Sequence, residues 1–311
     1  MLLPRRDFLL AASGLLLPLA ARRQDGEPVL APPCGGDPND LPQRVLGKTG
    51  RTLPILGLGC AGLGALEDDD AAVALVRRAL ESGARFFDVA PSDHDGQSER
   101  RLGLGVKEHA REELFVATKT LARDGDEALH ELERSLQRLG LDYVDGVQVQ
   151  ALASDADLER ALAKGGVVAA LASAIEKKKA RFLGVTAHDD PALLVRAFEQ
   201  HAFATAMVPV NPLLVKERSF VEHFLPTARA QELGVIAMRI YAGGALVGET
   251  RKVQPADLVR FALAQDGVTL ALPGAETIAQ WDEARHAATL PMPSAKELAR
   301  IVEAVRGGAG R

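Results

Sequence analysis

Short apolar runs alternate with amphipathic segments along most of the chain, from Leu41 onward. The runs are rich in Val, Ile, Leu and Phe on both faces, which is typical of parallel strands covered by helices. The amphipathic segments carry apolar residues at helical spacing; within 68–82, for example, Ala72 and Val76 share one face. Consecutive aspartates open that segment, where negative charge favours a helix N-terminus. The pattern predicts a domain in which strands and helices alternate.

Eight strand–helix units follow a short N-terminal hairpin, which is expected at 44–53 with its turn at 48–50. Strands are expected at 54–59, 85–88, 114–118, 143–149, 182–186, 205–208, 235–238 and 268–272. Helices are expected at 68–82, from about 98, and at 126–139, 155–179 with a Gly165-Gly166 interruption, 191–200, 217–233, 255–265, 278–288 and 293–305. Eight units close into a (β/α)₈ TIM barrel, whereas an open doubly wound sheet usually has fewer. The expected fold class is therefore α/β, with one barrel domain over residues 42–311.

The first 21 residues have the pattern of an export signal. Arg5 and Arg6 precede an apolar run over 8–20, which is of signal-peptide length and short for a membrane span. Paired arginines directly before such a run resemble a twin-arginine signal, which implies export of the folded protein by the twin-arginine machinery. We expect a periplasmic or extracytoplasmic location. A generic export signal or an uncleaved anchor is the alternative.

Residues 22–41 predict a Pro-rich linker without a core of its own. Cys34 lies in this linker, and Cys60 lies at the end of a predicted strand. A disulfide between them would require a mobile linker to reach the barrel mouth, so we do not expect one.

The composition excludes several classes of function. Hydrophobic residues make up 47% of the chain and charged residues 25%, which are globular proportions. The net charge of -5 argues against nucleic-acid binding, because a nucleic-acid-binding surface is basic. Two cysteines cannot form a four-thiolate metal site and no His-Glu-x-x-His motif is present, so we expect no metal. The barrel domain itself is not expected to span a membrane.

Polar residues stand at the ends of the predicted strands. The active site of a (β/α)₈ barrel lies at the carboxyl-terminal ends of its strands, so these residues would surround one mouth. They are Asp88, Lys119, Gln150, Thr186, His188, Asn211, Arg239 and Gly274. Together they would form a pocket with an acid, bases and several hydrogen-bond donors. His188 precedes a predicted helix start at 189–191, so a loop role, a capping role and a ligand-binding role all stay open for it.

Several motifs, taken in order, resemble the aldo-keto reductase superfamily over about 43–305. They are Val45-Leu46-Gly47-Lys48-Thr49-Gly50, Leu56-Gly57-Leu58-Gly59, Phe86-Phe87-Asp88-Val89-Ala90, Gly96-Gln97-Ser98-Glu99, Leu102-Gly103, Val116-Ala117-Thr118-Lys119, Leu141-Asp142-Tyr143-Val144-Asp145, Gly184-Val185-Thr186 and Leu272-Pro273-Gly274. The resemblance implies hydride transfer between a nicotinamide cofactor, NADP or NAD, and a small carbonyl substrate. It also implies four catalytic residues: a tyrosine that protonates the carbonyl oxygen, a lysine–aspartate pair that lowers the pKa of the tyrosine, and a histidine that polarises the carbonyl.

Only two of these four residues are kept. Asp88 and Lys119 match the aspartate and the lysine, but Asp93 stands at the tyrosine position, His94 at the following glycine and Gln150 at the histidine. An ionised carboxylate is a poor acid, and we expect Lys119 to favour the ionised form of Asp93. His94 is the better candidate acid if its loop turns inward, and Gln150 can donate a hydrogen bond without carrying charge. The alternatives are a solvated turn for the loop and a packing role for the ion pair.

The resemblance also implies cofactor-binding positions. They are Thr186, Met207, Met238, Arg239, Gly274, Ala275 and Glu276. Met207 replaces a glutamine, and Met238 replaces the aromatic ring that would stack on the nicotinamide. Glu276 would repel a 2′-phosphate, so we expect NAD at least as much as NADP. Backbone N–H groups around Gly274 could hold a pyrophosphate.

Three hypotheses of function follow. The first is an aldo-keto reductase-like oxidoreductase with a non-standard set of catalytic residues. The second is a catalytically degenerate barrel that acts as a ligand-binding or accessory protein. The third is a non-redox enzyme that uses Lys119 as a base or as a Schiff-base amine. We favour the first, because the resemblance covers almost the whole predicted domain.

Overall fold

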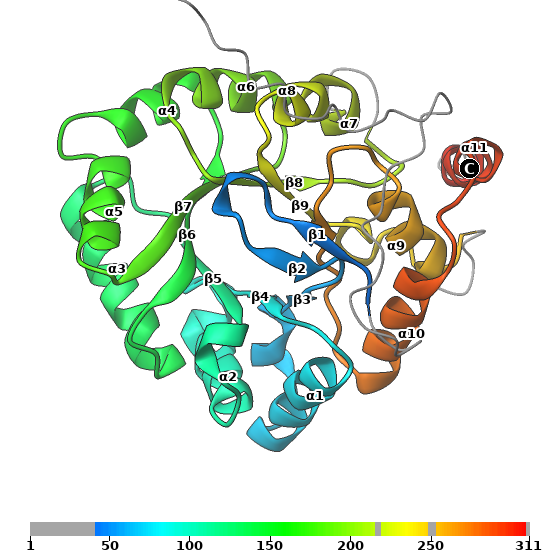
Figure 1. The fold of residues 1–311 in the computed structure, drawn as a ribbon, viewed down its shortest axis with the longest axis horizontal. Helices are drawn as coiled ribbons and strands as arrows, with labels where there is room; N and C mark the ends of the chain where they lie inside the picture. Colours follow the sequence, from blue (N-terminus) through cyan, green and yellow to red (C-terminus); the bar gives the residue numbers. More distant parts are fainter. Residues whose placement is uncertain (1–40, 215–218, 248–252, 309–311) are drawn as a thin grey trace, which may run out of the picture.

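The computed structural model describes residues 41–214, 219–247 and 253–308. The predicted signal peptide, all but the last residue of the predicted linker, and Cys34 lie outside these ranges. Within them, helices surround a central ring of strands (Figure 1). The ranges contain no helix long and apolar enough to cross a membrane, and no group of three or more His, Cys, Asp or Glu side chains placed to hold a metal ion.

Eight parallel strands form the ring, in the order in which they occur along the chain. They are β3 (Leu58–Gly59), β4 (Phe86–Asp88), β5 (Phe115–Thr120), β6 (Val144–Leu152), β7 (Ala180–Ala187), β8 (Thr205–Pro209), β9 (Gly234–Met238) and β10 (Leu270–Ala271). Parallel bridges from Leu56 to Ala271 and from Gly59 to Gly274 join the first and last strands. The predicted (β/α)₈ barrel is therefore confirmed.

Helices follow the strands at nearly all of the predicted places. They are α1 (Asp69–Glu81), α2 (Gln97–Val106), α3 (Gly125–Leu139), α4 (Asp155–Leu162), α5 (Val167–Glu176), α6 (Pro191–Gln200), α7 (Phe220–His223), α8 (Leu225–Ala230), α9 (Pro255–Leu263), α10 (Ile278–Thr289) and α11 (Ala295–Gly308). The prediction of one helix over 217–233 was wrong. The described part of that stretch forms α7 and α8, because Pro226 lacks an N–H group and belongs in the first turn of a helix.

The predicted N-terminal hairpin is present, and it closes the amino-terminal end of the barrel. Its strands are β1 (Gln43–Val45) and β2 (Thr52–Pro54), and Figure 1 shows it in blue across the centre of the ring. Leu46 and Leu53 of the hairpin belong to the same buried cluster as Phe86 and Phe115. The rings of those two phenylalanines stack with centroids 5.1 Å apart. This apolar plug leaves the carboxyl-terminal end as the mouth.

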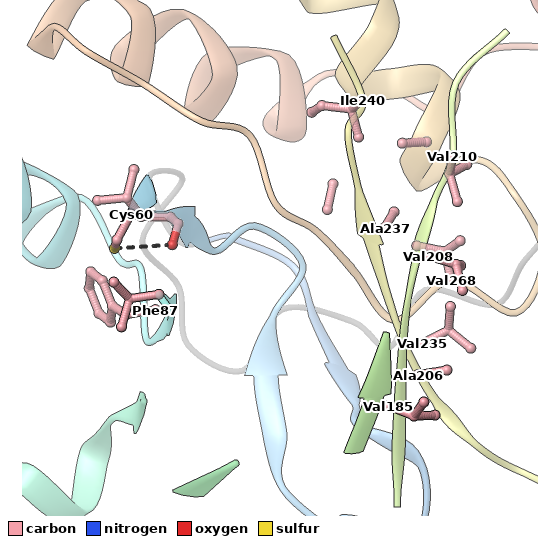
Figure 2. Packing of buried hydrophobic residues seen from close by; sticks show 14 of the residues in the cluster. Cys60, Phe87, Val185, Ala206, Val208, Val210, Val235, Ala237, Ile240 and Val268 are labelled. Carbon is pink, nitrogen blue, oxygen red and sulfur yellow. Dashed lines mark hydrogen bonds between the residues drawn. The ribbon is translucent and has the colours of Figure 1, made fainter. Parts of the chain in front are cut away.

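Side-chain alternation along each strand decides which residues reach the interior. Figure 2 shows the outer cluster, in which Val185, Ala206 and Val208 lie with other apolar side chains between the strands and the helices. Phe87 belongs to this outer cluster, and its neighbour Asp88 takes the opposite, inward direction. The period of two therefore sends the polar residues near the strand ends into the mouth.

Candidate active site

The centre of the mouth is an ion pair between Asp88 of β4 and Lys119 of β5. Lys119 Nζ lies 2.5 Å from Asp88 Oδ2, and it also donates a hydrogen bond to the carbonyl oxygen of Val89 at 3.1 Å. Both side chains are less than a tenth exposed. Burial raises the pKa of Asp88, and the positive charge of Lys119 opposes this shift. The two residues that the sequence aligned with the family pair are thus brought together.

Gln148 completes this centre, and the sequence analysis missed it. It lies two residues before Gln150 on β6, and its Nε2 donates to Asp88 Oδ1 at 3.0 Å. This bond fixes the orientation of the amide, because the reverse orientation would face Oε1 toward the carboxylate. Gln148 Oε1 is then buried without a hydrogen-bond partner among the described residues. The period of two from Gln150 could have identified Gln148 as another inward side chain.

Asp93 lies in a short 3₁₀ turn, Asp93–Gly96, and its carboxylate is hydrogen-bonded to the backbone. Oδ2 accepts a hydrogen bond from the N–H group of Ala90 at 2.8 Å. Burial raises the pKa of Asp93, although the charge of Lys119 acts in the opposite direction. Lys119 thus favours the ionised form of Asp93, as expected, but desolvation by burial is the larger effect and leaves the pKa raised.

His94 does not join the pair. The residue is exposed, has a left-handed backbone with φ 50°, and packs its Cβ against Gly64. Among the described residues it forms no hydrogen bond with Asp88 or Lys119. The loop conformation therefore leaves the candidate acid of the sequence analysis away from the centre.

Gln150 stands at the end of β6, beside a bulge. Its Nε2 is 3.4 Å from Ser92 Oγ, and its Oε1 is buried with no hydrogen-bond partner in the described chain. The next residue, Ala151, has φ 53°, and the pairing register with β7 shifts there. A bulge of this kind redirects the side chains around it and is common next to active sites.

Arg123, in the loop after β5, holds this bulge in place and was also missed by the sequence analysis. Its Nη2 donates to the carbonyl oxygen of Gln150 at 2.8 Å, and its guanidinium binds both carboxylate oxygens of Asp157 at 2.9 and 2.8 Å. The hydroxyl of Thr186 accepts from the N–H group of Ala151 at 2.8 Å. We call Arg123 and Asp157 the bulge clamp. It fixes the backbone from which Gln150 projects.

The two methionines of the implied cofactor site lie in the barrel interior. Met207 of β8 is 1% exposed and Met238 of β9 is 9% exposed, and both belong to the inner cluster with Ile236, Leu270 and Leu272. They offer apolar thioether surface where the family pattern implies an amide and an aromatic ring. Met238, at the end of its strand, is the closer of the two to solvent.

Two cavities open at the mouth, and Arg239 lines both. The first, of about 460 Å³, is lined by residues that include His188, Asn211 and Asp189. Burial is the main cause that lowers the pKa of His188, and the charge of Arg239 adds to it. Asp190, not His188, caps α6, since its carboxylate accepts from the N–H groups of Ala192 and Leu193. The side chain of His188 is thus left on the cavity wall.

The second cavity, of about 740 Å³, lies beside the ends of β9 and β10. Its wall contains the predicted cofactor positions Gly274, Ala275 and Glu276, together with Tyr241 and Glu283. Burial raises the pKa of the Tyr241 phenol, and the charge of Glu283 adds to this shift. A side chain at Gly274 would meet no atom within 4 Å, so the space in front of this backbone is open. Tyr241 was not among the residues predicted for this wall, although Met238 and Arg239 just before it were.

Comparison with known proteins agrees with this architecture. The model of the aldo/keto reductase family matches residues 55–257, which is more than half of the chain. The chain belongs to the aldo/keto reductase family. Among solved structures, the holo form of an aldo-keto reductase of Bacillus halodurans matches with a TM-score of 0.70 and 19% identity, covering 83% of this chain and 94% of that one. At this level of identity the likeness concerns the fold alone.

Curated relatives within the aldo/keto reductase family match over shorter stretches. L-galactose dehydrogenase of Arabidopsis thaliana is 33% identical over 156 residues, or 46% of this chain and 47% of that protein. D-threo-aldose 1-dehydrogenase of a Pseudomonas species is 28% identical over 231 residues, covering 63% of this chain and 68% of that one. The chain thus spans about half the length of the plant relative that it matches.

Proposed function

We propose that this chain is an NAD(P)-dependent oxidoreductase of a small carbonyl or alcohol substrate, with Lys119 in place of the missing phenol. One observation carries the proposal. An ammonium group has three N–H donors, and Lys119 Nζ gives one to Asp88 and one to the carbonyl oxygen of Val89. One donor remains. It sits at the mouth of the barrel, where a substrate carbonyl oxygen would develop negative charge.

The wall of the 740 Å³ cavity fits a dinucleotide. Gly274 leaves its backbone accessible, and the cavity lies within the usual size of cofactor sites. Glu276 and Glu283 would accept hydrogen bonds from ribose hydroxyls and would repel a 2′-phosphate. We therefore favour NAD over NADP, although NADP is bound in the structure of the Klebsiella pneumoniae family member (22% identity, TM-score 0.69). The bound cofactor would donate the hydride to a carbonyl substrate or accept it from an alcohol.

The remaining steps fall to side chains of this chain. Lys119 donates a hydrogen bond to the carbonyl oxygen, and Asp88 and Gln148 hold its ammonium group in place. Gln150 donates a second hydrogen bond from the bulge, in place of the family histidine. Asp93, whose pKa is raised by burial, holds a proton more readily than an exposed carboxyl and can return it to the alkoxide through solvent. His94 has no part in this scheme.

The geometry of the site supports the two alternative functions, a Schiff-base enzyme and a ligand-binding barrel, less well. A Schiff-base mechanism needs a neutral amine, but Lys119 is in a close, buried ion pair with Asp88. A silent ligand-binding barrel is supported by the loss of the tyrosine and the histidine, and its test is the same experiment. The names of the two curated relatives suggest sugar aldehydes and their oxidised forms as first substrates to try.

The test uses the full chain, titrated with NADH and NADPH by nicotinamide fluorescence and then assayed with aldoses. We expect micromolar affinity for NADH, weaker affinity for NADPH, and turnover that falls about 10²–10³-fold in Lys119→Met while NADH affinity is kept. NADH binding without turnover of any carbonyl compound would identify a ligand-binding barrel. No binding at millimolar cofactor would rule out the dinucleotide altogether.

A gain-of-function variant tests whether the substrate binds in the pose that the family residues imply. Asp93→Tyr combined with Gln150→His restores the family residues, and we expect it to raise reductase activity about tenfold or more, since general acid catalysis contributes about 10²-fold or more. The single variant Gln150→His is the matched control. A folded double variant with no gain on any aldehyde would contradict the family pose of the substrate.

We further propose that residues 1–21 direct export through the twin-arginine machinery. The support is the pair Arg5 and Arg6 directly before the apolar run. In a bacterial host with that machinery, the full chain should reach the periplasm and the variant with both arginines changed to lysine should stay in the cytoplasm. Equal export of both would point to a generic signal.

A further inference from the structure

Arg239 has an unusual backbone at the end of β9. Its φ is 50°, in the left-handed region that non-glycine residues avoid. Two hydrogen bonds hold it there: Asn211 Nδ2 donates to the Arg239 carbonyl oxygen at 3.0 Å, and the N–H group of Ala242 donates to the same oxygen at 2.8 Å. Asn211 is 5% exposed and is itself fixed, because its Oδ1 accepts from the N–H group of Leu213 at 3.1 Å. Strain held in this way clusters at functional sites.

The side chain of Arg239 differs from other arginines of the mouth. Arg123 gives its donors to Asp157 and to backbone carbonyl oxygens. Within residues 41–214, 219–247 and 253–308, the guanidinium of Arg239 has no hydrogen bond or ion pair. It is exposed and lines both cavities, so it stands on the ridge that separates them. An arginine held by its backbone but free at its guanidinium has five donors to offer to a ligand.

None of the charged residues in the described ranges neutralises Arg239 by contact. In the first cavity, the carboxylate of Asp190 caps α6 and also faces Arg196, with 3.6 Å between Oδ2 and Nη2. His188 shares the cavity wall with Asp189 and is a neutral donor when unprotonated. Glu276 and Glu283 line the other cavity. Lys119, at the centre, is already paired with Asp88.

We propose that Arg239 binds the carboxylate of an acidic substrate that occupies the mouth. A planar guanidinium binds a carboxylate through two parallel N–H···O bonds. The substrate is then an acidic hydroxylated carbonyl compound such as a hexuronate. This inference rests on the proposed function for the reaction, but not for the binding of the anion.

The experiment compares the full chain with Arg239→Gln by calorimetry. The probes are D-galacturonate and D-galactose, which differ only in the carboxylate, and NAD⁺ as the source of a diphosphate. We expect D-galacturonate to bind at least tenfold more tightly than D-galactose, and Arg239→Gln to remove that difference. Arg239→Lys, which keeps the charge without the bidentate geometry, should restore it in part. Arg77→Gln, on the outer helix α1, is the control and should change none of these affinities.

The outcomes separate a substrate carboxylate from the cofactor diphosphate. Loss of NAD⁺ affinity with unchanged D-galacturonate affinity would overturn the proposal and return Arg239 to the cofactor site that the family resemblance implies. If Arg239→Gln is folded by circular dichroism and weakens neither ligand, or if neither ligand binds the wild-type chain, the anion site is disproved. Arginine-dependent binding of D-galacturonate without turnover would overturn the proposed oxidoreductase and leave the anion site standing. If the wild-type chain turns over D-galacturonate and Arg239→Gln leaves kcat and KM unchanged, the oxidoreductase proposal stands and the anion site is disproved.

Discussion

Two buried carboxylates lie at opposite ends of the same barrel. Asp145, near the start of β6, is fully buried at the amino-terminal end, where it forms ion pairs with Arg111 at 2.7 Å and Arg181 at 3.0 Å. It also accepts the N–H group of Val116 at 3.0 Å. Asp88, at the end of β4, has one cation, Lys119, and one amide. The first carboxylate is surrounded by more positive charge than it carries, while the second shares a single ammonium group with the mouth.

The surroundings of the two carboxylates also differ in how completely their polar groups are paired. Around Asp145, the guanidinium carbons of Arg111 and Arg181 also lie over the ring of Tyr143, at 4.1 and 4.4 Å from its centroid. On the side of Asp88, the buried amide oxygens of Gln148 and Gln150 have no partner among the described residues, and two cavities open at the mouth. The carboxylate of Asp145 is thus matched by several partners, while the centre around Asp88 leaves polar atoms without a partner in the described chain, which is the arrangement expected of a site that meets a ligand.

The largest effect should come from removing the cation of the mouth. Lys119→Met keeps the length of the side chain and removes every N–H donor, so we expect kcat to fall about 10²–10³-fold, as for the loss of one oxyanion donor. Steady-state kinetics with NADH, together with NADH affinity, measures this. Lys119→Arg keeps the charge and should recover part of the rate. An undiminished kcat in the methionine variant would remove Lys119 from the reaction.

A substitution of Asp145, at the amino-terminal end of the barrel, should change the stability of the fold and leave catalysis unaffected. Asp145→Asn leaves arginines without their buried counter-ion, and breaking such a pair costs about 3 kcal/mol of the free energy of unfolding. Urea unfolding followed by circular dichroism measures this cost, and kcat should stay within twofold of wild type. A fall in kcat at temperatures where the variant is folded would mean that the two ends are coupled and would break the comparison.

The same contrast explains what the sequence could predict. The barrel follows from apolar periodicity and local caps, such as Asp68 on α1 and Asp190 on α6, because those signals act over a few residues. Asp88 and Lys119 follow from their places at strand ends. Arg123 could not be predicted, since it binds the carbonyl oxygen of Gln150 and a carboxylate 34 residues further along the chain. The dominance of burial over Lys119 in setting the pKa of Asp93 likewise needs the folded loop.

A smaller effect is expected at the bulge clamp, which lies between structure and function. Arg123→Gln should lower the free energy of unfolding by about 2 kcal/mol at neutral pH, as for charged hydrogen bonds, and should lower kcat because Gln150 loses its fixed position. Hydrogen bonds from Arg123 contribute to holding the pKa of Asp157 below its usual range. The stabilisation is therefore present above the pKa of the unfolded state and is lost as pH falls through the lower folded value.

Unfolding measured over a series of pH values provides the control for the Arg123→Gln prediction. Wild type and Arg123→Gln should differ most at neutral pH and converge in acid, where Asp157 is protonated in both. Asp157→Asn should show the same flattened acid limb. A stability difference that stays constant down to the acid limb would mean that Arg123 acts by packing and not through its charge.

The smallest effect concerns the histidine of the mouth and sharpens the contrast between free and enclosed charge. Burial lowers the pKa of His188, and Arg239 adds to the shift because its charge has no partner in the described chain. Arg239→Gln should therefore move the His188 pKa upward, by less than burial has lowered it, in an NMR titration of the imidazole. An anion bound at Arg239 should move it in the same direction in wild type, and should have no effect in the variant. An unmoved pKa in both experiments would mean that Arg239 points away from the first cavity, and that the ridge between the two cavities has no free positive charge to offer a ligand.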